Sequence, residues 1–446
     1  MSDLLSIGAS GVRAYQTALT TTSENIANAD VAGYARRTTR LDEVRAAGGA
    51  QSRTIDGSGV VASAVVRTAD AFRQDEVRRT GADLARTEAG IGWLERIENS
   101  LSASAVDTRI DAFFAAATRL AADPTAGAAR ATLLETASGV AGAFATARAG
   151  LDAAMGDLDA QAEATVGSLN ALTAALARVN GAIGRSSAGT SGSAALLDQR
   201  DAILEQMSAI SDVNVTLDAA GRAQVRAGGP GGPLLVSGDQ AATLTYVRAD
   251  DGGASFAVHG DDGIRPLLPQ GGALAGIADG AQRIGDATRA LDAVATQFVD
   301  AVNQVQAQGD DANGMPGQPI FAIGDPPARI SLVMGNPAAI AAAARGAGGR
   351  DNSNAVALAT LGRTTGAAAA IADLTTGNAA ALSARRTLGE AQRAMHDGAV
   401  GSRDAASAVN TDEEAVDLLR FQKAYQASSK VIQTARDIFE TLLNIR

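Results

Sequence analysis

The chain has 446 residues, a formal net charge of −11, 3% aromatic residues and no cysteine. This length is enough for two or three domains, but so few aromatic residues mean that the cores must rely on alanine-rich helices that approach each other closely. The lack of cysteine excludes disulfides, thiolate catalysis and cysteine-ligated metal sites, and the acidic balance argues against general nucleic-acid binding, which needs basic surface.

The beginning of the chain predicts an amphipathic helix with a weak apolar seam. The seam follows alternating steps of three and four residues, and Gly8 and Thr22 interrupt it. Its large members are Leu5, Val12, Tyr15, Leu19 and Ile26. Because a helix with such a seam is not expected to be stable alone, we expect it to order by packing on another helix and on neighbouring molecules.

Neither an ordinary export signal nor a membrane span is expected. The first residues lack a basic flank followed by an apolar stretch and a cleavage site. No window approaches the length of uncharged apolar sequence that a membrane helix needs, about eighteen residues. We therefore predict no membrane insertion and, if the protein leaves the cell, export without a cleaved signal peptide.

The next part of the chain predicts a short extended segment followed by a series of helices. Residues 40–67 hold short β-branched runs between glycines, which is typical of a hairpin. Helical spacing then predicts helices over residues 72–101, 107–122, 128–180 and 194–210. In the last of these, Asp198 and Arg200 are candidates for catalysis or ligand binding, but no His, Ser or metal-type cluster accompanies them. We therefore favour an ion-paired or solvated helix face.

From residue 213 the hydrophobic period changes from helical to alternating, which predicts a compact β-rich domain inserted into a helical one. The glycine-rich run around Pro230 lacks the Lys-Ser/Thr of a phosphate-binding loop, so it is interpreted as a turn. Later elements are predicted as a helix over 273–308, a strand over 328–333, a short helix over 337–345, a helix capped by Asn354, and a helix over 379–396 that breaks near 398–401.

The end of the chain, residues 411–446, predicts a long amphipathic helix of roughly 50 Å. Thr411 and Glu414 have the spacing of a capping box. Its seam has heptad spacing, with large members Leu418, Phe421, Tyr425, Ile432, Phe439 and Leu442, and a second row of Ala424, Val431, Ile438 and Ile445 lies beside it. A stripe this wide predicts more than one neighbouring helix.

Sequence motifs of known catalytic or metal chemistry are not found. His259 and His396 are far apart in the sequence and have no patterned partners, and no zinc-protease, nucleophile-elbow, dinucleotide or P-loop motif is present. Asp310, Asp311 and Asn313 lack the ligand spacing of a calcium loop. We therefore predict no catalytic residue, no cofactor and no metal site.

Two motifs, one at each end, resemble those of flagellar axial proteins, the rod, hook and hook-associated family. The amino-terminal motif is Ser10-Gly11, Asn25-Ile26-Ala27-Asn28 and Gly33-Tyr34-Ala35-Arg36. The carboxyl-terminal motif includes Asp412-Glu413-Glu414 and the run from Phe421 to Ala427, with Gln422, Tyr425 and Gln426. Two further stretches, Leu196-Leu197-Asp198-Gln199-Arg200-Asp201 and Asp351-Asn352-Ser353-Asn354, resemble the hook-associated branch of this family.

The resemblance implies a structural subunit of the bacterial flagellum rather than an enzyme. For the hook-associated branch it implies a place at the hook–filament junction, needed for filament assembly on the hook. It implies as partners copies of the same chain in a ring or helical assembly, the hook protein, and a second junction protein on the filament side. It also implies uncleaved type III export to the extracellular flagellum and a cytoplasmic export chaperone on the carboxyl-terminal helix.

The expected architecture is mainly α with an inserted β domain. Residues 1–39 and 405–446 form a terminal coiled coil, expected to be disordered in the monomer. Residues 40–212 and 270–404 form a helical body, and residues 213–269 form a β-rich outer domain. Two alternatives remain: a hook or distal rod protein, which shares both terminal motifs, and a wall-degrading hydrolase carried on an axial scaffold.

Overall fold

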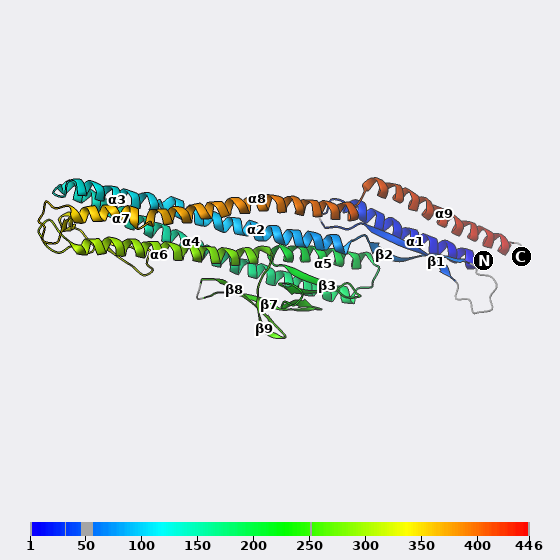
Figure 1. Ribbon diagram of the computed structural model, residues 1–446. Coiled ribbons are helices and arrows are strands. Elements are labelled where there is room, and N and C mark those ends of the chain that lie inside the picture. The colour runs from blue at the N-terminus through cyan, green and yellow to red at the C-terminus, as the bar shows by residue number, and fades with distance from the viewer. Residues whose placement is uncertain (1, 32, 46–56, 250–251, 445–446) are drawn as a thin grey trace.

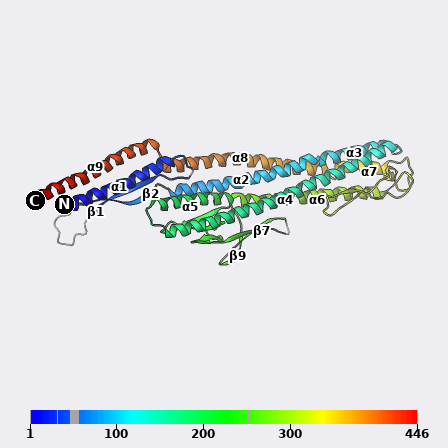
Figure 2. The ribbon, with the colours of Figure 1, turned by 180° about the vertical axis from the view of Figure 1, so that it is seen from behind.

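The computed structural model describes residues 2–31, 33–45, 57–249 and 252–444. Figure 1 shows a long helical body from one end of which the two terminal helices project side by side. Small sheets lie against one flank of the body, and the view from behind in Figure 2 shows the same arrangement. The prediction of a mainly α fold with β structure inserted in the middle is confirmed.

The body is built from helices that run along its length. They are α2 (Ala71–Ser104), α3 (Val106–Ala122), α4 (Gly127–Arg185), α5 (Ser191–Ile210), α6 (Gly272–Gln308), α7 (Ser353–Thr364) and α8 (Ala367–Ser407). The few aromatic residues are concentrated where α3, α4 and α6 meet. There Phe298 contacts Phe113, Phe144 and Phe321 with ring centroids 5.4 to 6.2 Å apart, and such pairs add about 0.5–1.5 kcal/mol each beyond their buried area.

The predicted hairpin over residues 40–67 is confirmed. Strands β1 (Arg37–Arg45) and β2 (Gly57–Arg67) pair antiparallel. The hairpin lies along α1 (Ser2–Ala27), where a Cβ at Gly59 would overlap the side chain of Ser10. The sequence therefore places a glycine, with φ +110°, at the closest approach of the hairpin to the helix.

The β-rich insertion forms two sheets beside α4. One contains β3 (Val213–Leu217), β4 (Ala223–Ala227), β5 (Leu234–Ser237) and β6 (Gln240–Ala241), and the other β7 (Thr243–Arg248), β8 (Ala254–Gly260) and β9 (Gly263–Leu267). The amides of Asn170 and Asn180 on α4 each bond both backbone groups of one strand residue, Leu244 and Ala223 respectively. Helix α4 continues to Arg185, past its predicted end near residue 180, and Ile183 in this last part is buried in the core.

Several local predictions between residues 309 and 407 are wrong. The short helix over 337–345 is only the 3₁₀ turn η1 (Pro337–Ala339), within a set of two-residue strands, β10 (Gly309–Asp310), β11 (Phe321–Ala322), β12 (Ser331–Leu332) and β13 (Ala343–Ala344). Asn354 is not a cap, because its buried amide donates to the carbonyl of Ala341. The break near 398–401 is absent because packing on α2 outweighs the low helix propensity of the two glycines.

The capping box predicted at Thr411 is also wrong. Helix α9 (Thr411–Asn444) begins at Thr411, but the side chain of Asn410 accepts the hydrogen bonds from the backbone N–H groups of Asp412 and Glu413. Glu414 turns instead toward α1 and is 1% exposed. A residue that the local spacing assigns to a helix cap is therefore a buried long-range contact.

The stretch Ser353–Thr441 contains an 18-residue window with a mean hydropathy of 1.3, enough by length and composition to cross a membrane. Hydropathy alone thus finds a window that the sequence-based expectation excluded. The stretch is not one helix, since α7, α8 and α9 are separated by short connections. One such window is weak evidence for a membrane span.

Candidate assembly interface

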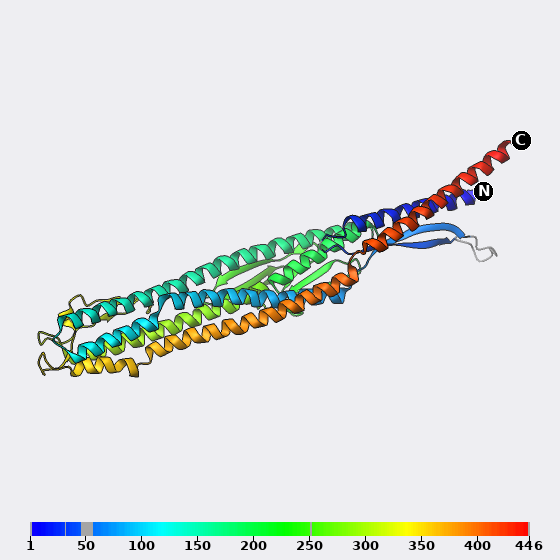
Figure 3. The same cartoon turned by 90° about the horizontal axis from the view of Figure 1, so that it is seen from above.

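Helices α1 and α9 form an antiparallel pair that projects beyond the body (Figure 3). The face of α1 that α9 covers is made of small residues rather than the predicted apolar seam. Gly8 lies under Ile432, where a Cβ would come 2.6 Å from Ile432 Cγ1, and Gly11 lies under Ser428. Ala14 and Ala18 continue the buried side of α1. This small face lets the two helix backbones approach closely.

The predicted seam of α1 lies at the edge of this contact. Leu5 and Ile26 are 37% and 38% exposed, and Val12, Tyr15 and Leu19 are half-buried. Tyr15 contacts Phe421 with ring centroids 6.5 Å apart. The seam is therefore only partly used within one molecule.

The predicted seam of α9 divides into a covered part and a free part. Leu418, Phe421, Tyr425 and Ile432 are half-buried toward α1. Phe439 is 53% exposed because the antiparallel register carries it past the described start of α1. Val431 and Ile438 of the second row are also exposed. Ile445 and the side chain of Leu442 lie outside the described residues.

The exposed and half-buried apolar residues beside the contact form two rows with the same heptad spacing. At about 100° of rotation per residue, Leu5, Val12, Leu19 and Ile26 lie on one side of the α1–α9 contact, and Ala424, Val431 and Ile438 lie on the opposite side. A helix pair with apolar rows on two opposite sides has surfaces for two neighbours.

A buried polar cluster ties the helix pair together where it meets the body. Asn25, 1% exposed, donates from Nδ2 to Glu414 at 2.9 Å and to the carbonyl of Arg37 at 2.8 Å, and its Oδ1 accepts from the Arg37 backbone and the Tyr34 hydroxyl. Glu414 pairs with Arg36 at 2.6 Å. Burial raises the pKa of Tyr34 to about 12, against the opposing effect of Arg37.

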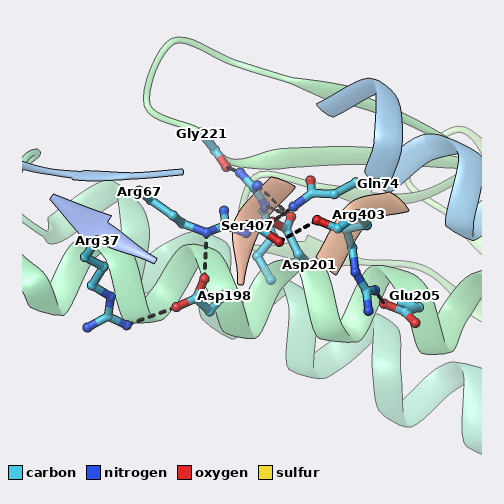
Figure 4. A network of polar contacts seen from close by, with 10 residues as sticks. Arg37, Arg67, Gln74, Asp198, Asp201, Glu205, Gly221, Arg403 and Ser407 are labelled. Carbon is cyan, nitrogen blue, oxygen red and sulfur yellow. Dashed lines mark hydrogen bonds and ion pairs between the residues drawn. The ribbon is translucent and has the colours of Figure 1, made fainter. Parts of the chain in front are cut away.

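A second cluster connects the hairpin to α5, as Figure 4 shows. Asp198 pairs with Arg67 at 2.6 Å and with Arg37 at 2.9 Å, and Arg67 also pairs with Asp201. Arg200 pairs with Asp201 and donates to the carbonyl of Gly221. Burial raises the pKa of Asp198 above its ordinary value, and the two arginines oppose this rise. The sequence favoured an ion-paired or solvated helix face for Asp198 and Arg200. The structure shows an ion-paired face, and most of these ion pairs are buried.

The remaining motif residues have simpler positions. Asn28 donates to the carbonyl of Glu24, and Gly33 has φ +78° in the turn before Tyr34. Leu197 packs against the body core, whereas Gln422 and Gln426 are exposed on α9. Sequence reasoning missed Arg36, Arg37, Arg67, Gln74, Arg403 and Glu414 as contact residues. The Arg36-Arg37 pair, two residues after Tyr34, was the available signal, since arginine forms strong ion pairs with carboxylates.

The acidic loop after α6 is held by its own backbone. Hydrogen bonds from the Met315 and Asn313 backbones to the Asp311 carboxylate outweigh desolvation, so the pKa of Asp311 lies below its ordinary value. Among the described residues, no group of three or more His, Cys, Asp or Glu side chains is placed to hold a metal ion.

Three family models match separate parts of the chain. Residues 93–321, half of the chain, match the model described as flagellar hook-associated protein FlgK helical domain. Residues 5–34 match the flagella basal body rod protein model, and residues 402–445 match the flagellar basal body rod FlgEFG protein C-terminal model.

Curated proteins named flagellar hook-associated protein 1 are similar to the chain. The one from Escherichia coli (strain K12) is 32% identical over 341 residues, which cover 73% of this chain and 61% of that protein. The one from Bacillus subtilis (strain 168) is 24% identical over 97% of this chain and 96% of that protein. The chain thus spans about three fifths of the length of the first relative.

A solved structure, the flagellar hook junction protein FlgK from Burkholderia pseudomallei, matches 56% of this chain and 47% of that chain with a TM-score of 0.50 and 23% identity. At this identity the match supports the fold alone.

Proposed function

This chain belongs to the flagellar hook-associated protein FlgK family, and from that premise we propose that it is a structural subunit of the hook–filament junction. The observation that carries the proposal is the match of the helical body, residues 93–321, to the helical domain of this family. The models that match the two ends belong to rod proteins, so the body separates this chain from the rest of the axial family. The family is structural, and no catalytic role is implied.

The terminal helices are the proposed assembly elements. Their two apolar rows lie on opposite sides of the pair, so the row of α1 in one copy packs against the row of α9 in the next copy. Such contacts are heterologous and generate rings or open helical assemblies. Burying one large apolar side chain in such a contact is worth about 1.5–3 kcal/mol.

We propose a division of labour along the chain. Residues 1–39 and 405–446 form the inner axial part, whose exposed apolar side chains are covered on assembly. Residues 40–212 and 270–404 form the body, and residues 213–269 form the outer β-rich domain. The hook protein contacts one end of the assembly, and a second junction protein on the filament side contacts the other. Export proceeds through the flagellar channel without cleavage, and a cytoplasmic chaperone covers the apolar stripe of α9 beforehand.

A deletion strain tests this function. Cells without the chain are expected to make hooks without filaments and to release flagellin into the medium. Electron microscopy of the cells and immunoblotting of the medium measure these two outcomes, and complementation with the intact chain is the control. Loss of the hooks themselves would instead support a hook or distal rod protein, whose family shares both terminal regions.

A further inference from the structure

We propose that Asn25 and Glu414 form a register clamp, which fixes the lengthwise alignment of α9 on α1. The clamp is a property of the single chain, and only its consequence for assembly depends on the proposed function. Together the two residues act as positioning residues for the α1–α9 pair.

The rest of the α1–α9 contact selects its register weakly. Large knobs that enter defined holes are what fix the alignment of two helices. On α1, Gly8 and Gly11 lie under α9 and present no such feature. Tyr15, which contacts Phe421, is half-buried at the edge of the contact.

A shift by one heptad keeps this contact apolar. Gly11, which now lies under Ser428, would then lie under Ala435 or Phe421. The heptad spacing of α9 presents its apolar seam in either register. Apolar burial alone therefore does not distinguish the registers.

The polar cluster does distinguish them. Asn25 and Glu414 are each 1% exposed, and they face each other at 2.9 Å across the helix pair. A shifted α9 would leave the Glu414 carboxylate and the Asn25 amide buried among groups that cannot pair with them, which is costly for polar groups out of water. A single buried polar contact of this kind is a known way to fix helix register.

The clamp is anchored to the body on both sides. Arg36, which pairs with Glu414, donates its backbone N–H to the carbonyl of Ser407 at 2.9 Å. Asn25 bonds both backbone groups of Arg37, whose side chain pairs with Asp198 on α5. These contacts fix the position of the α1–α9 pair relative to the body. In an assembly, this alignment sets which residue of the α1 row stands opposite which residue of the α9 row.

The absence of cysteine in the chain makes disulfide reporters a direct test. In purified monomer, Gly11→Cys with Ser428→Cys reports the observed register. A Cβ at Gly11 would lie 3.0 Å from Ser428 Cβ, so a small separation of the two helices brings the pair into the Cβ–Cβ range of a disulfide, about 3.5–4.5 Å. Gly11→Cys with Ala435→Cys and Gly11→Cys with Phe421→Cys report the two registers shifted by one heptad. Mass spectrometry of oxidised samples gives the ratio of shifted to observed bridges.

In the otherwise unchanged chain, only the Gly11–Ser428 bridge is expected. Asn25→Leu and Glu414→Leu are each expected to raise the ratio of shifted to observed bridges by about tenfold or more, since each removes the penalty for shifting. The matched variant Glu414→Gln keeps a partner for Asn25 and is expected to retain the observed register. Trp93 fluorescence confirms that the body of each variant is folded.

Two outcomes would overturn the proposal. One is an unchanged ratio of bridges in both leucine variants. The other is loss of the Gly11–Ser428 bridge without a gain of either shifted bridge, which would mean that the two residues hold the helices together without selecting their register. Because the bridges form within one molecule, neither outcome depends on hook–filament assembly, whereas the deletion strain tests the proposed function alone.

Discussion

Gly280 is a residue at which α6 passes close to α2. The space that a Cβ would need is occupied by the ring and Cβ of Trp93, the one tryptophan of the chain. Gly280→Ala is therefore expected to destabilise the body by about 1–3 kcal/mol, because an added methyl group forces the two helices apart. Urea unfolding gives the free energy, and Trp93 fluorescence should change in the native state.

The matched control for Gly280→Ala is Gly156→Ala. Gly156 is an exposed helical glycine of α4 with open space where a Cβ would stand. Alanine there is expected to leave stability unchanged or to raise it by up to about 1 kcal/mol, through helix propensity alone. Equal stability of the two variants would show that the α2–α6 contact is looser than described.

Tyr34 makes the free energy of unfolding depend on pH in the alkaline range. Because its folded-state pKa of about 12 lies above the ordinary value of 10.0, the folded state holds the phenolic proton more tightly than the unfolded state. The stability linked to this proton is present below pH 10 and is lost as the pH rises toward 12. The difference in unfolding free energy between the chain and its Tyr34→Phe variant should therefore fall from pH 9 to pH 11, as measured by urea unfolding. A constant difference would contradict this assignment.

At the residue scale, local spacing predicted some helix ends but not the roles of polar side chains. The helix predicted over residues 379–396 is longer at both ends, because α8 runs from Ala367 to Ser407. The position of Thr411 as a helix start is correct, but Glu414 three residues later serves Asn25 and Arg36, nearly four hundred residues earlier in the chain. The bonding partners of such a carboxylate depend on which helix packs against it. The spacing of residues in the sequence does not reveal that helix. Asp198 and Arg200 were correctly interpreted as ion-pairing residues because no other chemistry stood near them in the sequence.

At the element scale, α8 is the most weakly held long helix of the body. Of its 41 residues only Ala367, Ile371, Leu382, Gly389 and Ala399 are buried, and just the first two belong to the main core. The rest of its contacts with the body are polar. Asn378 and His396 contact α2, the latter at Thr80. Arg385 pairs with Asp279 on α6, and Arg403 pairs with Glu205 on α5. Surface cavities of about 540, 560 and 360 Å³ lie along it.

This packing predicts early local opening of α8. Residues 375–407 are expected to exchange their amide hydrogens about tenfold or more faster than the buried residues of α4 and α6, because few apolar contacts oppose their release. Hydrogen exchange followed by mass spectrometry measures this in the monomer. The internal control is residues 367–374 of the same helix, which reach the core. Equal protection along α8 and α6 would contradict the prediction.

The existence and type of most elements could be predicted from the sequence, because the spacing of hydrophobic residues in the helical body differs clearly from that in the β insertion. The hairpin and the alternating strands after residue 213 are examples. What could not be predicted was where tertiary contacts override local signals. Helix α4 continues through its internal glycines, and its Asn170 and Asn180 bond the strands of the two sheets. Helix α8 continues through Gly398 and Gly401 and packs against α2.

For the whole molecule, the sequence predicted two terminal helices that pack on each other and on neighbouring molecules, because the apolar stripe is wider than one partner helix can cover. In the structure they cover each other only in part, and the larger apolar side chains remain at the edges of the pair. The small face of α1 was not predicted, because Gly8 and Gly11 look like interruptions of a seam until α9 is placed over them. Within one molecule, α1 thus contributes mainly small residues to the contact, and Leu5 and Ile26 of α1 and Val431, Ile438 and Phe439 of α9 stay exposed for neighbours.

The central claim, that these free apolar residues assemble the axial polymer, is tested most directly by Phe439→Asp in the deletion strain. Its matched control is Gln433→Asp, which places the same charge on an exposed polar site of α9. Filaments are counted by electron microscopy, and secretion and folding of both variants are checked by immunoblotting and circular dichroism. We expect Gln433→Asp cells to carry filaments and Phe439→Asp cells, with a folded and secreted chain, to carry bare hooks. Normal filaments on Phe439→Asp cells would contradict the account.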